Sequence, residues 1–258
     1  MAPFNVHFLI AEKIWPELNG RWQSCYGQFC FGCIAPDVDK LSTSLTQKET
    51  HFFDRTSDYD LMATHRSAAF LRQQADFLGR PFNELPPDAQ AFALGYLCHL
   101  CVDEVSKHMW RRETWLQFKQ LHPGTAFAAL DESARQQTQD FPALVRALCT
   151  ISVPHVIPRI PADDLNKLWQ GVCFFVRAQN AETEFMALVD TFDRPTPAQR
   201  QLWQQRFRAE ISLARAQIGV FQLETLVKAS LARSRSRLAD LIEGRMPEPD
   251  YPVIDKSG

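Results

Sequence analysis

Residues 91–110, AFALGYLCHLCVDEVSKHMW, constrain the fold of this chain more than any other segment. The segment is apolar enough to be buried, and it carries His99 and Asp103 four residues apart. On a helix this spacing places an imidazole and a carboxylate on one face, one turn apart. Both groups are costly to bury without a partner, and a metal ion can satisfy both at once. The segment therefore predicts a buried helix that carries two donors of a metal site.

The composition favours helices over strands. Of the 258 residues, 45% are apolar and 22% are charged, which is ordinary for a soluble globular protein, and only ten are glycine. Apolar residues recur at helical spacing in both halves of the chain, and no segment shows a convincing alternation typical of a strand. We expect an all-α, multi-helix single domain with a metal site buried between helices.

The histidines are distributed unevenly along the chain. Five of the seven lie within the first 108 residues. We therefore expect one domain over residues 1–246, in which residues 1–122 bear the metal and residues 126–245 form a helical cover. The polar, proline-bearing residues 247–258 are expected to be a flexible tail.

Periodicity and helix breakers give a coarse map of the elements. The polar segment over residues 40–60 is expected to be irregular, and Ala-Pro-Asp at the end of an apolar stretch places Asp37 in a turn. We expect helices over residues 7–18, 60–78 and 88–110 or on to 118, and helical segments over residues 131–150, 161–192 and 197–244.

Charge and hydropathy narrow the class of protein. A formal net charge of −2 gives no electrostatic reason to expect a nucleic-acid partner. No segment reaches the roughly 18 uninterrupted apolar residues of a transmembrane helix, and the first residues lack the pattern of a signal peptide. We expect a cytoplasmic location. The sequence does not indicate an oligomeric state.

The cysteines offer a competing metal site. Seven cysteines, an odd number, favour free thiols in a chain with no export signal. Cys30 and Cys33 form one C-x-x-C pair, and Cys98 and Cys101 form another. These pairs are much further apart than the roughly 15–20 residues usual in a four-cysteine zinc site. Because small thiols also pack well in apolar helices, we prefer free thiols.

Each polar residue of the first half also has a structural interpretation. His99 alone resembles a hydrogen-bonded core histidine, Asp103 can pair with an arginine or with Lys107, and Asp37 can accept backbone N–H bonds in its turn. These interpretations do not explain why His7, like Asp37 and His51, is embedded between apolar residues. The remaining histidines lack a donor at ligand spacing and are expected at the surface or in loops: His65, His122 and His155.

Four short sequence motifs follow one another along the chain: His7, FGCIAPD ending at Asp37, THF around His51, and AFALGYLCH with Asp103. This order resembles the zinc-dependent phospholipase C family, whose relatives include the single-strand-specific S1/P1 nucleases. The resemblance covers roughly residues 7–110. It implies an all-α fold with a zinc cluster in a cleft, and hydrolysis of phosphodiester bonds.

The resemblance also implies roles for individual residues. Asp37, His51, His99 and Asp103 would hold one zinc, and Asp103 would bridge to a second zinc bound by His7. Asp37 would also orient or deprotonate the attacking water. Clustered cations suit this chemistry because they stabilise a phosphodiester transition state. The implied substrate is a phosphodiester small molecule or a phospholipid head group.

The sequence departs from the family pattern in two places. The secreted enzymes use their mature N-terminal residue as a ligand, whereas six residues precede His7 and no processing site is evident. His108 is the candidate for the next histidine ligand, but nine residues past His99 it points to the opposite side of a straight helix, at about 100° per residue. The later H-x-x-x-D/E pair is absent. We expect one zinc, leave a second open, and expect no third.

The alternatives differ in activity and in substrate. One is a metal-stabilised, non-catalytic helical binding protein on a degraded phospholipase C scaffold. An HD-type phosphohydrolase is disfavoured because the sequence contains no His-Asp dipeptide. The sequence does not identify the substrate. Four aromatic residues either line a lipid pocket or belong to the ordinary core: Trp169, Phe174, Phe175 and Trp203.

Overall fold

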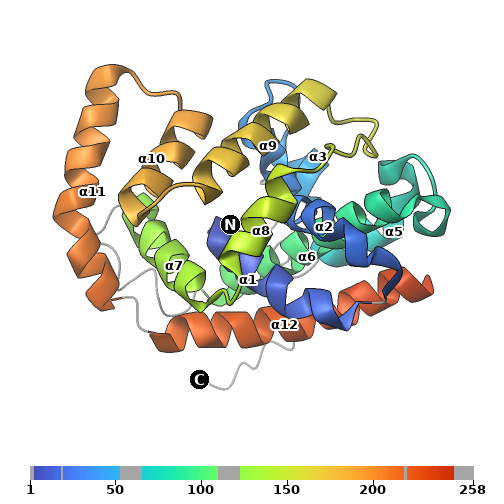
Figure 1. Ribbon diagram of the computed structural model, residues 1–258. Coiled ribbons are helices and arrows are strands. Elements are labelled where there is room, and N and C mark those ends of the chain that lie inside the picture. Colours follow the sequence, from blue (N-terminus) through green and yellow to red (C-terminus); the bar gives the residue numbers. More distant parts are fainter. Residues whose placement is uncertain (1–2, 19, 53–65, 110–122, 218–219, 247–258) are drawn as a thin grey trace.

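The architecture is all-α, as predicted. The computed structural model describes residues 3–18, 20–52, 66–109, 123–217 and 220–246. Within these ranges the chain forms eleven α-helices, four short 3-10 helices and no strand (Figure 1). None of the helices described is both long and apolar enough to cross a membrane.

The helices of the first half surround the predicted donors. They begin with α1 and end with α6, the longest helix of this half. Their bounds are α1 (Phe4–Ile14), η1 (Trp15–Glu17), η2 (Gly20–Cys25), α2 (Tyr26–Gly32), η3 (Ala35–Lys40), α3 (Gln47–His51), α5 (Arg66–Leu78), η4 (Phe82–Glu84) and α6 (Pro87–Met109).

In the described residues of the second half the chain forms six helices, and their role as a cover stays a prediction. In Figure 1, α12 runs along the bottom of the molecule and α11 lies outermost on the left. The bounds are α7 (Pro123–Gln137), α8 (Phe141–Cys149), α9 (Ala162–Val176), α10 (Ala181–Phe192), α11 (Pro197–Gln217) and α12 (Val220–Glu243). The predicted domain boundaries stay predictions, and residues 247–258 lie outside the described part of the chain.

The helix map needs two kinds of correction. Residues 47–51 form the short helix α3 inside the segment that we expected to be irregular, because Thr46 and Glu49 form a capping box. The segments 131–150, 161–192 and 197–244 are helical as expected, but each is divided between two helices. Asp140 accepts a hydrogen bond from Ala143 N at 2.9 Å and starts α8, and Asn180 forms a capping box that starts α10.

Helix α6 forms the centre of the core. Most of its residues are buried, including all of residues 89–104, and it packs against α2 on one side and α12 on another. This all-round burial explains why the segment lacks a clear polar face in the sequence. Any polar side chain on α6 must therefore find its partner inside the protein.

The contact between α2 and α6 brings two backbones together. A Cβ atom on Gly95 would lie 2.1 Å from the Phe29 carbonyl oxygen, and one on Gly32 would lie 2.2 Å from the Phe92 carbonyl oxygen. Real Cβ atoms do not approach so closely, so both positions require glycine. The contact sets the end of α2 directly beside the middle of α6.

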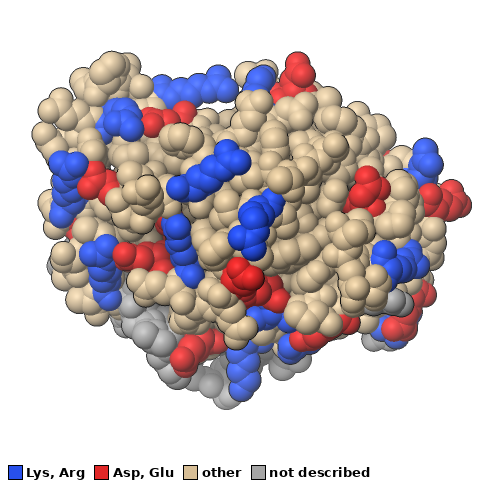
Figure 2. Space-filling model, viewed as in Figure 1, with Lys and Arg blue, Asp and Glu red and all other residues tan. Residues whose placement is uncertain are grey.

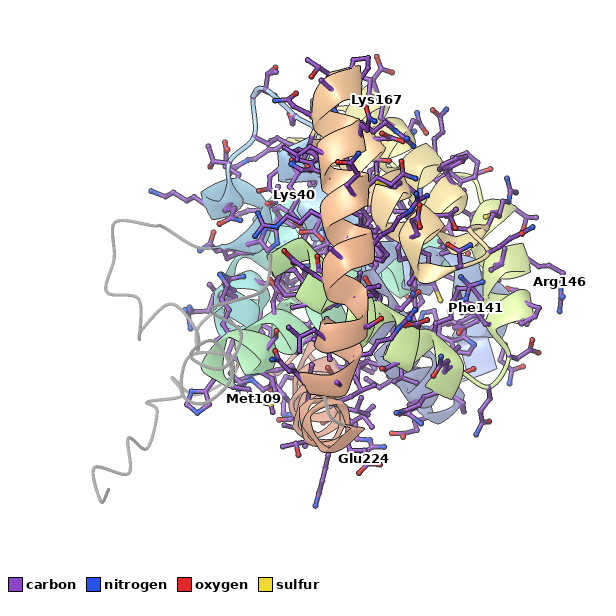
Figure 3. All side chains as sticks on the ribbon, turned by 90° about the vertical axis from the view of Figure 1, so that its left-hand side faces the viewer. Lys40, Met109, Phe141, Arg146, Lys167 and Glu224 are labelled. Carbon is purple, nitrogen blue, oxygen red and sulfur yellow. The ribbon has the colours of Figure 1, made fainter. Side chains whose placement is uncertain are left out.

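Ion pairs attach α11 to helices α7 and α10. Arg215 makes two hydrogen bonds to Glu132 on α7, at 2.6 and 2.9 Å, and Arg208 contacts both carboxylate oxygens of Glu182 on α10. Figure 3 shows α11 upright at the front of the molecule, with Glu224 of α12 at its foot. On the face shown in Figure 2, basic and acidic side chains are interspersed, in keeping with the small net charge.

The α2–α6 contact predicts the effect of adding one methyl group. Gly95→Ala should lower the melting temperature by about 3–10 °C, because overpacking a tight core costs about 1–3 kcal/mol. Gly20→Ala is the control, since a Cβ there would meet no atom closer than 3.7 Å. Thermal unfolding followed by circular dichroism measures both variants. A Gly95→Ala protein as stable as the parent would contradict the close contact.

Candidate metal centre

Four elements deliver five buried donors to one place. His7 lies on α1, Asp37 on η3, His51 at the end of α3, and His99 and Asp103 on α6. All five side chains are at most 2% exposed. They form two overlapping groups whose donor atoms lie within 4.8 Å of one another: His7, His99 and Asp103 in one, and Asp37, His51 and His99 in the other. The structure thus brings together five of the six predicted ligands.

His99 belongs to both groups, and the backbone just after α2 fixes its ring. Its Nδ1 lies 2.8 Å from the Cys33 carbonyl oxygen, to which it donates a hydrogen bond. Its Nε2 therefore presents a lone pair to the centre, 3.3 Å from Nε2 of His51 and 3.8 Å from Oδ2 of Asp103. A backbone carbonyl that holds the far nitrogen is a common support for a metal-binding histidine.

His51 is oriented by its neighbours on α3 and η3. Thr50 Oγ1 lies 2.9 Å from His51 Nδ1, and Oδ1 of Asp39 lies 3.8 Å from the same nitrogen. The Tyr96 hydroxyl donates a 2.5 Å hydrogen bond to the Thr50 carbonyl oxygen and so attaches α3 to α6. The other ring nitrogen, Nε2, lies 3.5 Å from Oδ1 of Asp37. His51 therefore faces the centre through Nε2.

Asp103 belongs to the group with His7, and its carboxylate also lies close to His51 of the other group. Its Oδ1 is 3.9 Å from Nε2 of His7, and its Oδ2 is 3.9 Å from Nε2 of His51. Arg66 Nη1 donates a hydrogen bond to the same Oδ2 at 3.0 Å. The two oxygens of Asp103 thus face different histidines.

The arrangement leaves buried polar atoms without a protein partner. The His7 ring stacks on His99 with centroids 4.2 Å apart, and neither His7 nitrogen has a hydrogen-bond partner although the residue is fully buried. Oδ2 of Asp37 is in the same situation. An unsatisfied buried polar atom costs about 1–3 kcal/mol, so such atoms need an explanation. Imidazole and carboxylate donors are ligands that zinc accepts, and the residues therefore fit a zinc ion.

Burial and local charge place these groups in metal-binding protonation states. Burial lowers the pKa of His99 to about 4, and it also lowers the pKa of His7 and of His51, so the rings are neutral near pH 7. Burial alone would raise the pKa of Asp37, but Lys40 at 2.6 Å and the nearby histidines outweigh it and hold that pKa below its usual range. Neutral imidazoles and ionised carboxylates are the forms that bind metals.

The structure does not bring His108 to the centre. This residue is exposed in the last turn of α6 and belongs to neither donor group. The phase of a straight helix explains this placement, because His108 points away from the face that carries His99. We therefore leave His108 out of the proposed ligands. His155 is exposed, and His65 and His122 lie outside the described residues.

Arg66 is a site residue that the sequence analysis missed. The side chain is only 1% exposed and contacts Asp103 from the start of α5. Glu104 holds this end of α5, because it accepts hydrogen bonds from Ser67 N at 2.7 Å and from Ser67 Oγ at 2.9 Å. An arginine does pair with Asp103, which was one alternative to a metal. The signal in the sequence was the adjacent acid pair on a buried helix, which needs two sets of donors.

The cysteines are free, as predicted. Six of the seven are buried, and burial raises the pKa of Cys30, Cys33 and Cys101. A protonated thiol is a poor metal ligand. Within the described residues, both groups able to hold a metal consist of histidine and aspartate, so neither C-x-x-C pair is part of one.

The overlap at His99 predicts an uneven loss of metal among variants. His99→Ala should lose at least the zinc held with Asp37 and His51, because it removes the donor that belongs to both groups. His7→Ala should lose only the part held by its own group, and the exposed His108→Ala should lose none. Elemental analysis of the purified proteins measures zinc per chain, with circular dichroism to confirm folding. Full zinc in folded His99→Ala, or loss from His108→Ala, would contradict the assignment.

Comparison with known proteins adds one match. No curated protein and no solved structure matches the chain. Residues 6–142, slightly more than half of the 258 residues, match the family described as zinc dependent phospholipase C. The matched range contains all five converging donors, which agrees with the resemblance seen in the sequence pieces. The chain belongs to the zinc dependent phospholipase C family.

Proposed function

We propose that this protein is a zinc-dependent hydrolase of phosphodiester bonds, similar to phospholipase C, with an activated water as the nucleophile. The observation that carries the proposal is the convergence of five buried donors, among which His7 and one oxygen of Asp37 lack a protein partner. The substrate would be a phosphodiester small molecule or a phospholipid head group. The cytoplasmic location and the lack of a nucleic-acid partner stay predictions.

The donor geometry suggests how the ligands divide. Asp37, His51 and His99 would hold one zinc together with Asp103, and Asp103 would also bind a second zinc with His7. The two Asp103 oxygens, which face different histidines, support this sharing. When bound, zinc supplies positive charge that lowers the pKa of water and stabilises the charge developing on the phosphate. The chain's own task is to hold the donors in place and to orient water and substrate.

Asp37 is the residue that we expect to orient the attacking water. Its Oδ1 contacts Lys40 Nζ at 2.6 Å, which leaves Oδ2 as the oxygen without a protein partner. A carboxylate whose pKa is held below its usual range retains a proton poorly. The role of Asp37 is therefore to accept a hydrogen bond from water and align it, rather than to keep the proton.

Lys40 and Arg66 add positive charge around the centre. Lys40 is partly exposed beside Asp37, so its ammonium can attract an anionic phosphodiester toward the donors. Arg66 is buried against Asp103 and orients that carboxylate through a contact of 3.0 Å to Oδ2. The two cations thus have separate functions, one toward the substrate and one toward a ligand.

Hydrolysis should depend on both zinc and Asp37. The zinc-loaded protein should cleave at least one member of a panel containing bis(4-nitrophenyl) phosphate, 4-nitrophenyl phosphocholine and phosphatidylcholine micelles. Asp37→Asn should lower kcat by about 10²–10⁴-fold, the usual loss on removing a group that acts on the proton or the water. The release of nitrophenol or phosphocholine measures the rate, and His108→Ala is the control with full activity.

The non-catalytic alternative makes a different prediction for the same proteins. A metal-stabilised binding protein would show a higher melting temperature with zinc and no turnover for Asp37→Asn to abolish. Zinc-dependent turnover that is lost in Asp37→Asn would reject that alternative. A zinc-loaded, folded protein that cleaves nothing in the panel would reject the hydrolase.

A further inference from the structure

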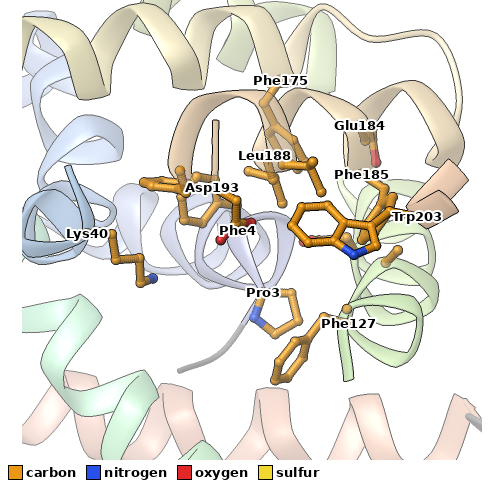
Figure 4. Close-up of a pocket in the computed structure, with 15 residues that line it drawn as sticks. Pro3, Phe4, Lys40, Phe127, Phe175, Glu184, Phe185, Leu188, Asp193 and Trp203 are labelled. Atoms are coloured by element: carbon orange, nitrogen blue, oxygen red, sulfur yellow. The ribbon is translucent and has the colours of Figure 1, made fainter. Parts of the chain in front are cut away.

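A cavity of about 400 Å³ lies between the start of α1 and helices α7, α9, α10 and α11. Its volume is within the range of small-molecule sites. Figure 4 shows Lys40 on one side of it and Trp203 with Phe127 on the other. None of the five metal donors lines the cavity, and most of the residues that do line it lie outside the matched residues 6–142. The residues that form the cavity are therefore separate from those of the metal centre.

One buried acid, Asp131, sets this cavity apart from the rest of the core. Five acidic side chains are buried in the described part of the chain, and four of them contact a lysine or an arginine: Asp37 with Lys40, Asp103 with Arg66, Glu104 with Arg233 and Glu184 with Arg135. Asp131 on α7 is the fifth, and it forms no ion pair with any described residue. Because a carboxyl is almost never fully buried without a partner of opposite charge, Asp131 needs an explanation.

The protein holds only one oxygen of the Asp131 carboxyl. Oδ1 accepts a 2.5 Å hydrogen bond from the backbone N–H of Asn5, whereas Oδ2 makes no hydrogen bond with a described residue. The side chain is 2% exposed and lines the cavity. Oδ2 is therefore a hydrogen-bond acceptor for a molecule that occupies the cavity.

The charges around Asp131 favour a cation. Glu184 also lines the cavity, and Asn5 joins the two acids, since its Nδ2 lies 3.4 Å from Oε2 of Glu184. Arg135 pairs with Glu184, so this buried pair of acids has one arginine for two carboxyls. Burial and the charge of Glu184 raise the pKa of Asp131 well above its usual range, as expected for a carboxyl without a cation. An ammonium group in the cavity would supply the missing positive charge.

The rest of the lining is mainly aromatic. Phe4 meets Phe175 edge-on at 5.5 Å and meets Phe192 edge-on at 5.8 Å. Such packing builds an apolar wall that suits the hydrocarbon part of a ligand. The aromatic residues of the lining are Phe4, Phe127, Phe175, Phe185, Phe192 and Trp203.

The remaining charged residues of the lining lie nearer to solvent. Lys40 pairs with Asp37, and in Figure 4 it lies on the side of the cavity opposite Trp203. Asp193, the third acid of the lining, is partly exposed, and so are Lys40 and Trp203. These partly exposed residues give a small molecule access from solvent to the buried carboxyl.

We propose that this cavity binds a small amine with an apolar body, whose ammonium group pairs with Asp131 while the body lies against the aromatic side chains. The ammonium donates a hydrogen bond to Oδ2. It also gives Asp131 the cation that the other four buried acids have within the chain. This binding site is additional to the proposed hydrolase centre and does not depend on it.

Two ligands of equal shape test the need for a positive charge. Titration calorimetry on the zinc-loaded protein should give 4-phenylbutylamine a Kd about tenfold lower than that of 4-phenylbutan-1-ol, because hydrogen bonds between charged groups are the stronger ones. Both ligands carry the same apolar body, so the comparison isolates the ammonium group. Equal Kd values, or tighter binding of the alcohol, would overturn the proposal.

Asp131→Asn tests the partner of the ammonium group. The variant keeps an oxygen for the Asn5 N–H but loses the charge, so the Kd of 4-phenylbutylamine should rise about tenfold and that of the alcohol should stay within about twofold. Asp163→Asn is the matched control, because Asp163 is exposed on α9 and does not line the cavity. Elemental analysis should find the same zinc content in both variants. Unchanged amine binding by folded Asp131→Asn would contradict the proposal, including the case in which the amine binds to zinc instead.

A larger side chain at Leu188 tests the location without removing a charge. Leu188 lines the cavity, and Leu188→Trp should raise the Kd of both ligands about tenfold by filling the space. Leu202→Trp is the control, because Leu202 is 60% exposed and does not line the cavity. Equal amine affinity of these two variants would overturn the assignment to this cavity.

Discussion

The candidate site depends on the direct backbone contact between α2 and α6. Gly32 and Gly95 leave no room for a side chain between these helices, so the chain that follows α2 reaches the middle of α6. The Cys33 carbonyl oxygen then accepts the hydrogen bond that fixes the tautomer of His99. His99 in turn is the one donor shared by both groups. A close helix contact, rather than a loop, therefore determines where the imidazole lone pair points.

The polar centre has its own electrostatic compensation. Two aspartates inside a helical core would be strongly unfavourable without cations, and Lys40 and Arg66 supply them at 2.6 and 3.0 Å. The histidines stay neutral because burial lowers their pKa. Both ring nitrogens of His7 and one oxygen of Asp37 nevertheless lack a hydrogen-bond partner. We therefore expect metal binding to stabilise the fold, because the metal would satisfy atoms that the protein alone leaves unpaired.

Much of the site could be predicted from local sequence, and some of it could not. The four-residue spacing of His99 and Asp103 is a property of one helix, so it could be predicted. Arg66 could not, because its burial depends on Glu104 holding the start of α5, a contact between residues 37 positions apart in the sequence. The angle between His99 and His108 on a straight helix also predicted that His108 points away from the other donors, and His108 is exposed.

The role of the aromatic residues and the helix ends of the second half could not be predicted from local sequence either. Sequence could not decide whether the aromatic stripe is core or cavity, since both place apolar residues at helical spacing. The structure divides the four residues: Phe175 and Trp203 line the cavity, Trp169 packs against the core, and Phe174 is 66% exposed. The helix breaks within the cover were missed because single caps such as Asn180 are weak signals inside a strongly periodic segment.

Helix α1 carries His7 of the metal centre together with Phe4, which lines a cavity beside the start of the helix. Three residues of an α-helix span about 4.5 Å along its axis. Phe4 also packs edge-on against Phe175 and Phe192, far from the donors in the sequence. A displacement of the start of α1 would therefore move this aromatic packing and the His7 donor together.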